Sequence, residues 1–238
     1  MIWRPPFRMA VFDERPAFWY SAPRHTAYGP KSLSRFLPGS PDPMDIEAAK
    51  SDILATEDLL ERALKLSGLV TTLFAEQGYR LIVVGGSAVE FYTEGGYMSG
   101  DIDFCRYLSR AIPLRLAQDV MARLGAKGGP RSWRVLGLFV DLLGYLENES
   151  TSPKRKLETP YGPIEIIPPE LALVERVLGA YYPTPSEEAA VVAKKMMATS
   201  LADPTFDWAE AERLADLRDF KILPEFQAMK KEVQDGSA

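Results

Sequence analysis

The sequence contains very few of the residues that build disulfides and transition-metal centres. Its 238 residues include one cysteine, Cys105, and one histidine, His25. One cysteine cannot form an internal disulfide, and one histidine cannot supply the several ligands of a zinc or non-haem iron centre. A Ser-His-Asp hydrolase would depend on His25, which lies in a proline-rich segment unsuited to holding a general base in register. These absences exclude whole classes of chemistry.

Long apolar runs and a positive overall charge are also missing. No apolar stretch approaches the length that crosses a bilayer, and the opening MIWRPPFRMAVF lacks the features of a secretory signal. We therefore expect a cytoplasmic protein with no membrane partner. The formal net charge is −5, which argues against a general nucleic-acid coat protein. A local basic patch such as Lys154, Arg155 and Lys156 could still contact nucleic acid.

Composition and texture predict three regions. Residues 1–44 are rich in proline and aromatic residues without a regular period, so we expect an irregular N-terminal arm. Its aromatic side chains are consistent with packing on the domain, on a partner or on another subunit, or with a disordered or untranslated segment. Residues 45–167 mix helix and strand signals and form the expected core, and residues 168–238 read as a C-terminal helical lobe.

Periodicity and capping signals predict an α+β fold with a small mixed sheet flanked by helices. Asp45 suits an N-cap, and Gly78 and Gly125 suit helix ends. The predicted helices cover 45–66, 67–78, 87–94, 113–125 and three segments after 168; the predicted strands cover 81–84, 101–105, 133–143 with a kink at Gly137, and a hairpin within 157–167.

A strand that ends in Gly85, Gly86 and Ser87 is the first candidate for ligand binding. Two glycines allow a sharp turn and close backbone approach, and a helix N-terminus offers N–H groups and partial positive charge to a phosphate. The Ser87 hydroxyl would add to that cradle. The alternative is a plain tight turn with Ser87 as an N-cap.

Three aspartates on predicted strands form the second candidate. Asp101 and Asp103 are two residues apart and present both carboxylates on one face, as magnesium bridging requires. Asp141 lies inside the apolar FVDLL, where a carboxylate is costly to bury unless it is paired or binds a metal. The alternatives are an exposed edge strand for the pair and a solvated face for Asp141.

The segment VVGGSAVEFYTEGGYMSGDIDF, with the later FVDLL, resembles the signature of the DNA polymerase beta-like nucleotidyltransferase superfamily. From about Leu81 to Asp219 the chain is similar to small prokaryotic nucleotidyltransferase-like proteins related to AbiE-type abortive-infection toxins. The resemblance implies a nucleotidyltransferase fold, with Mg²⁺ held by Asp101, Asp103 and Asp141 and nucleotide phosphates held by Gly85, Gly86 and Ser87.

The same resemblance implies an enzyme that transfers a nucleoside monophosphate from a nucleoside triphosphate, with ATP as the default donor, to an acceptor hydroxyl. The acceptor stays open between a tRNA end, a protein and a small molecule, and the oligomeric state is undetermined. The rival interpretation is a catalytically silent binding protein of a toxin-antitoxin or defence pair. Lys194 and Lys195 are candidates for triphosphate contacts or solvated lysines, and Cys105 is expected to be a core residue.

Overall fold

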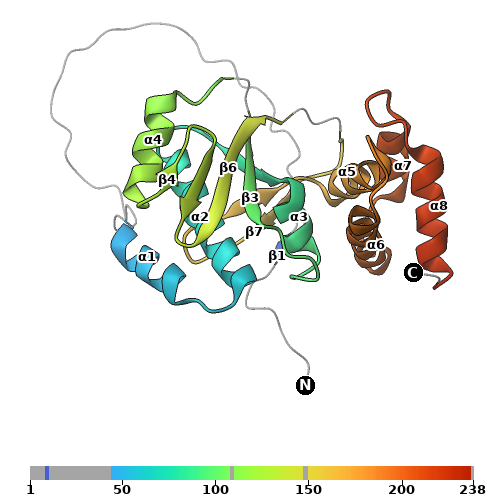
Figure 1. Ribbon diagram of the computed structural model, residues 1–238, viewed down its shortest axis with the longest axis horizontal. Helices are drawn as coiled ribbons and strands as arrows, with labels where there is room; N and C mark the ends of the chain where they lie inside the picture. Colours follow the sequence, from blue (N-terminus) through green and yellow to red (C-terminus); the bar gives the residue numbers. More distant parts are fainter. Residues whose placement is uncertain (1–8, 11–43, 108–109, 147–149, 237–238) are drawn as a thin grey trace, which may run out of the picture.

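A computed structural model of the chain describes residues 9–10, 44–107, 110–146 and 150–236. Its centre is a mixed eight-stranded sheet in the order β1-β7-β8-β2-β3-β6-β5-β4. Helices flank this sheet, and four more helices gather beside it (Figure 1). The α+β architecture expected from the sequence is therefore confirmed.

The middle of the sheet consists of β2 (Leu81–Val84), β3 (Asp101–Arg106) and β6 (Leu138–Tyr145). All four residues of β2 are buried, as its unbroken apolar run predicts. Strand β3 runs antiparallel to β2 and parallel to β6. On the β2 side follow β8 (Ile164–Ile166), β7 (Arg155–Leu157) and β1 (Met9–Ala10), and on the β6 side follow β5 (Ser132–Val135) and β4 (Lys127–Gly128).

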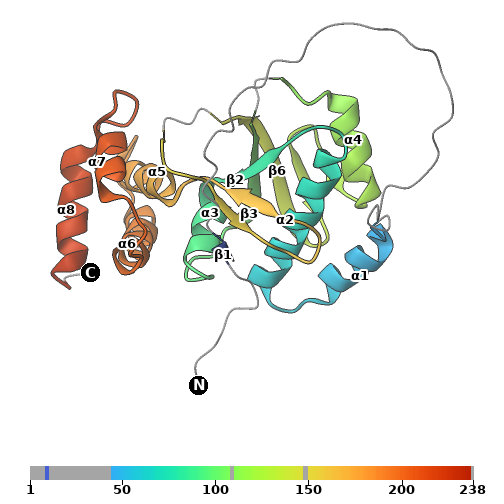
Figure 2. The ribbon, with the colours of Figure 1, turned by 180° about the vertical axis from the view of Figure 1, so that it is seen from behind.

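Four helices belong to the sheet region: α1 (Ile46–Ala55), α2 (Leu59–Ala75), α3 (Gly85–Tyr92) and α4 (Leu114–Arg123). Figure 2 shows α2 crossing the back of the sheet. The prediction that the first helix continues to Leu66 is wrong, because Asp58 accepts a hydrogen bond from the Glu61 N–H and starts a new helix there. The Asp-x-x-Glu pattern at Asp58 is a capping signal that marks this break.

A second prediction needs correction at residues 133–143, where we expected one kinked strand. The segment forms the antiparallel pair β5 and β6, joined at Leu136 and Gly137. Both residues have positive φ, 48° and 87°, as the mirror-image turns that suit twisted hairpins require. The turn reverses the chain, so β6 rather than a continuation of β5 runs beside β3.

The C-terminal helices are α5 (Pro169–Tyr181), α6 (Glu187–Ala202), α7 (Trp208–Asp216) and α8 (Leu223–Gln234). They lie together at one side of the sheet (Figure 1), and the helical texture predicted after residue 168 is confirmed. The division into three domains stays a prediction, and the N-terminal arm lies outside the described residues apart from β1 and Met44. Within the part of the chain that the structure describes, no helix is both long and apolar enough to cross a membrane.

Candidate active site

The three aspartates converge at one point of the sheet. Strands β3 and β6 are parallel neighbours, and their register sets Asp103 beside Asp141 and Asp101 beside Phe139. Ile102 and Val140 on the opposite face are buried, so strand alternation directs the three carboxylates to the other face. One oxygen of each carboxylate lies within 4.8 Å of the other two. The geometry offers three hard oxygen ligands to a single cation.

Burial and neighbouring negative charge both act on the Asp103 carboxyl group. Burial, followed by the nearby carboxylates of Asp101 and Asp141, raises the pKa of Asp103 to about 6, while the N–H of Gly86 and the charge of Arg176 oppose that rise. Carboxylates this close repel one another unless a cation lies between them. Donor type and mutual repulsion therefore both fit a divalent metal ion.

The glycine turn lies directly against these carboxylates. Helix α3 begins at Gly85, two residues earlier than expected, and Gly85 has a φ of +62°. A Cβ on Gly85 would lie 2.4 Å from Oδ2 of Asp103, and a Cβ on Gly86 would lie 2.7 Å from Oγ of Ser99. A side chain at either position would therefore force the Asp103 carboxylate or the Ser99 hydroxyl to shift, and Gly85 is also favoured by its backbone conformation. The N-terminal end of α3 thus adjoins the acid cluster.

Ser87 ties this turn to β3. Its side chain is 1% exposed; the hydroxyl donates to the Val84 carbonyl at 3.0 Å and accepts from the Asp103 N–H at 3.1 Å. The hydroxyl therefore fixes the spacing between the turn and Asp103. A phosphate at this turn would meet the backbone end of α3, with the Ser87 side chain behind it.

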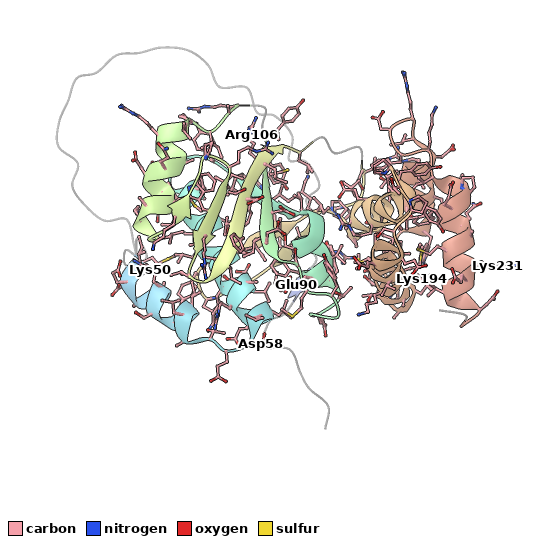
Figure 3. All side chains as sticks on the ribbon, viewed as in Figure 1. Lys50, Asp58, Glu90, Arg106, Lys194 and Lys231 are labelled. Carbon is pink, nitrogen blue, oxygen red and sulfur yellow. The ribbon has the colours of Figure 1, made fainter. Side chains whose placement is uncertain are left out.

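Two residues that sequence reasoning missed hold Asp101. Ser99 Oγ donates to Asp101 Oδ1 at 3.0 Å, and the Ser99 N–H donates to Glu90 Oε2 at 2.8 Å. Glu90 is 4% exposed on α3 and is labelled in Figure 3. The sequence signal was present, because Glu90 is the one charged residue in GGSAVEFY and lies four residues after Gly86, on the same helix face.

Arg176 on α5 is a third missed residue. Its charge acts on Asp103, and its buried Nε has no hydrogen-bond partner among the described residues. Next to it, burial raises the pKa of Glu175 to about 7. The signal was a charged pair inside the apolar helix segment LALVERVL, where charges need a partner or a ligand.

The remaining candidates lie elsewhere. Lys194 is ion-paired with Glu232 among the C-terminal helices (Figure 3), and Lys195 Nζ donates to the Gly96 carbonyl at 2.7 Å. Cys105 is buried, and burial raises the pKa of its thiol to about 11. It is a core residue, as expected.

Comparison with known proteins gives similarity only to solved structures. No protein-family model matches the chain. No curated protein matches it. An antigenic nucleotidyltransferase-like protein from Paracoccidioides brasiliensis is 13% identical, with a TM-score of 0.49 over 74% of this chain and 94% of that chain.

Two structures of the antibiotic-resistance factor ANT(2'')-Ia are also similar. Its solution structure is 12% identical, with a TM-score of 0.42 over 71% of this chain and 92% of that chain. Its complex with adenylyl-2''-tobramycin is 12% identical, with a TM-score of 0.36 over 71% and 95%. These are similarities of shape at low identity, and they carry no conclusion about function.

Proposed function

We propose that this chain is a metal-dependent nucleotidyltransferase of the DNA polymerase beta-like superfamily. The observation that carries the proposal is the convergence of Asp101, Asp103 and Asp141 within 4.8 Å, directly beside the glycine turn that begins α3. Carboxylates that bind a metal and a helix N-terminus that binds phosphate are the two parts that a metal-nucleotide complex requires.

Each part of the site would have a separate role in the transfer. Gly85, Gly86 and Ser87 would receive the β- and γ-phosphates at the N-terminal end of α3, and Arg176 would add a cation from α5. Asp141 would accept the proton of the acceptor hydroxyl. The oxygen of that hydroxyl would attack the α-phosphorus of the nucleotide, and pyrophosphate would leave. The products are the nucleotidylated acceptor and pyrophosphate.

Asp101, Asp103 and Asp141 would hold the metal, with Mg²⁺ as the expected ion because all ligands are carboxylate oxygens. When bound, Mg²⁺ would neutralise charge on the phosphoryl oxygens. Ser99 and Glu90 would keep Asp101 in position. ATP is the proposed donor of the nucleoside monophosphate. The proposed acceptor is a tRNA end, a protein or a small molecule. The proposed subgroup is that of proteins related to AbiE-type toxins.

The test is thermal unfolding with ATP, GTP, CTP and UTP, each with and without Mg²⁺. We expect stabilisation by at least one nucleotide only when Mg²⁺ is present, by about 2.7 kcal/mol at a ligand concentration 100-fold above Kd. Asp101→Ala/Asp103→Ala should abolish the shift. The matched control is Asp119→Asn, which changes an exposed acid on α4 and should keep it.

Turnover is then measured with α-labelled nucleotide and candidate acceptors. Label that appears in an acceptor in the wild type, and not in Asp141→Asn, supports transfer. Binding that requires metal and acids, without label in any acceptor, would instead favour the silent binding protein of a toxin-antitoxin or defence pair. Absence of both binding and transfer contradicts the proposal.

A further inference from the structure

A cavity of about 1050 Å³ lies between the sheet and the C-terminal helices. Its walls come from the start of α2, the end of α3 with the turn that follows, β7 and α6. None of the three aspartates lines it, so it is distinct from the acid cluster. Its position between two groups of elements and its size are typical of small-molecule sites.

The interior of this cavity is mainly apolar. Side chains from several elements form it, namely Leu60, Leu64, Phe91, Leu157, Met196 and Phe206. At the surface, Leu59 and Met98 also line it and are 43% and 52% exposed. Removing this apolar surface from water is favourable in free energy. An apolar ligand of matching size is therefore the favourable occupant.

The polar lining carries one dominant sign of charge. Among the residues that the structure describes, five carboxylates line the cavity against one guanidinium, Arg155; they belong to Glu57, Asp58, Glu61, Glu94 and Asp203. Arg155 is already engaged, at 3.4 Å from Asp203 and 2.8 Å from Thr205 Oγ1. Glu61 is likewise paired with Lys65 at 3.0 Å.

The three other carboxylates lie at the exposed side of the cavity, and of these Asp58 also accepts the Glu61 N–H as the N-cap of α2. Glu57 and Asp58 precede α2, and Glu94 follows α3, so two separate segments contribute the same charge to one rim. Figure 3 labels Asp58 below the sheet, and this residue is the N-cap of α2. Carboxylates beside low-dielectric walls attract cations and disfavour anions.

We propose that this cavity binds a small organic cation with an apolar body. The apolar interior would enclose the body, and the rim of Glu57, Asp58 and Glu94 would hold the positive end. This goes beyond nucleotide transfer and does not depend on it, because the acid cluster contributes no lining residue. The same charges disfavour a nucleotide, which is polyanionic, in this cavity.

The experiment uses the full chain and three matched aromatic probes: tryptamine, a cation at neutral pH; 3-methylindole, which is neutral; and indole-3-propionate, an anion. Binding is measured by ligand-observed NMR titration at low and high salt. We expect tryptamine to bind roughly tenfold more tightly than 3-methylindole at low salt, with less advantage at high salt, and indole-3-propionate to bind most weakly.

Two variants locate the site. Glu57→Gln/Glu94→Gln should weaken tryptamine severalfold and leave 3-methylindole unchanged, whereas Glu187→Gln/Glu188→Gln, which alters exposed acids at the start of α6 outside the cavity, should change neither. Thr199→Trp, on the cavity wall, should weaken binding of every probe. Circular dichroism confirms that each variant is folded.

Equal binding of all three probes, or preference for the anion, would overturn the assignment of a cationic ligand. Tryptamine binding that is as tight in Glu57→Gln/Glu94→Gln and in Thr199→Trp as in the wild type would overturn the location. The proposal also fails if none of the three probes binds the wild type. Asp101→Ala/Asp103→Ala should bind the probes like the wild type, so a failure of nucleotide transfer is separable from a failure of this proposal.

Discussion

Oδ2 of Asp103 lies 2.4 Å from the position that a Cβ on Gly85 would occupy. Gly85 follows the last residue of β2, and Asp103 lies in the middle of β3, where it pairs with Val84 across the antiparallel ladder. The glycine is therefore part of the wall of the acid cluster. Any side chain at this position would push the carboxylate away from its neighbours.

Gly85→Ala should lower stability and abolish metal binding together. The new methyl group meets the Asp103 carboxylate, and a φ of +62° strains a residue that has a Cβ by about 1–2 kcal/mol. The measurements are chemical denaturation and Mn²⁺ titration by electron paramagnetic resonance, with Mn²⁺ in place of Mg²⁺.

Gly78→Ala is the matched control, because Gly78 has a φ of +78° and a Cβ added there would meet nothing within 4 Å. We expect a similar backbone cost there and unchanged Mn²⁺ affinity. If Gly85→Ala also binds Mn²⁺ like the wild type, then contact with Asp103 does not shape the metal site.

Ser87→Ala should weaken the metal site through the backbone of β3. The substitution leaves the Asp103 N–H and the Val84 carbonyl without their buried partner, at a cost of about 1–3 kcal/mol. Ser67→Ala removes an equally buried hydroxyl that donates to the Ala63 carbonyl at 2.8 Å. The Ala63 carbonyl keeps its helical hydrogen bond in Ser67→Ala, so only Ser87→Ala should unfold more easily and bind Mn²⁺ more weakly. Equal Mn²⁺ affinity in the two would show that Ser87 acts on stability alone.

Glu90 should act on Asp101 through Ser99. Glu90→Gln keeps an oxygen that accepts the Ser99 N–H, so Mn²⁺ affinity should stay within about threefold of the wild type. Glu90→Ala leaves that N–H unpaired and should cost roughly 1–3 kcal/mol in stability and about tenfold in Mn²⁺ affinity. If Glu90→Ala is less stable but binds Mn²⁺ as tightly as the wild type, then Glu90 stabilises the fold without positioning Asp101.

Glu175 should make the fold less stable as pH rises. Burial raises its pKa from 4.5 to about 7, so between these values the folded chain keeps a proton that the unfolded chain releases. The free energy of unfolding therefore falls from about pH 4.5 to about pH 7 and is level above that range. Glu175→Gln should remove the part of this slope that Glu175 causes and gain about 3 kcal/mol at pH 8, since each pKa unit corresponds to about 1.4 kcal/mol. Urea denaturation across pH 5–8 measures it, and an unchanged slope in Glu175→Gln would contradict the assignment.

The sequence by itself determined the order of the parts and the chemistry of the site residues. The buried strand before Gly85, the alternation of Asp101 and Asp103 with apolar residues, and the helical stretches after residue 168 all follow from local periodicity. The two wrong predictions also had local signals that would have corrected them. The capping pattern at Asp58 marks the start of α2, and Leu136-Gly137 marks the turn between β5 and β6.

Only the tertiary structure decided which distant residues meet. Parallel pairing of β3 with β6 brings Asp141 beside Asp103, and the packing of α5 brings the charge of Arg176 to the same carboxylate. The roles of Ser99 and Glu90 depend on a turn that folds back onto α3, and the cavity depends on helices more than a hundred residues apart. Periodicity describes one segment at a time, whereas strand pairing and helix packing are fixed by the surfaces that several segments bury together.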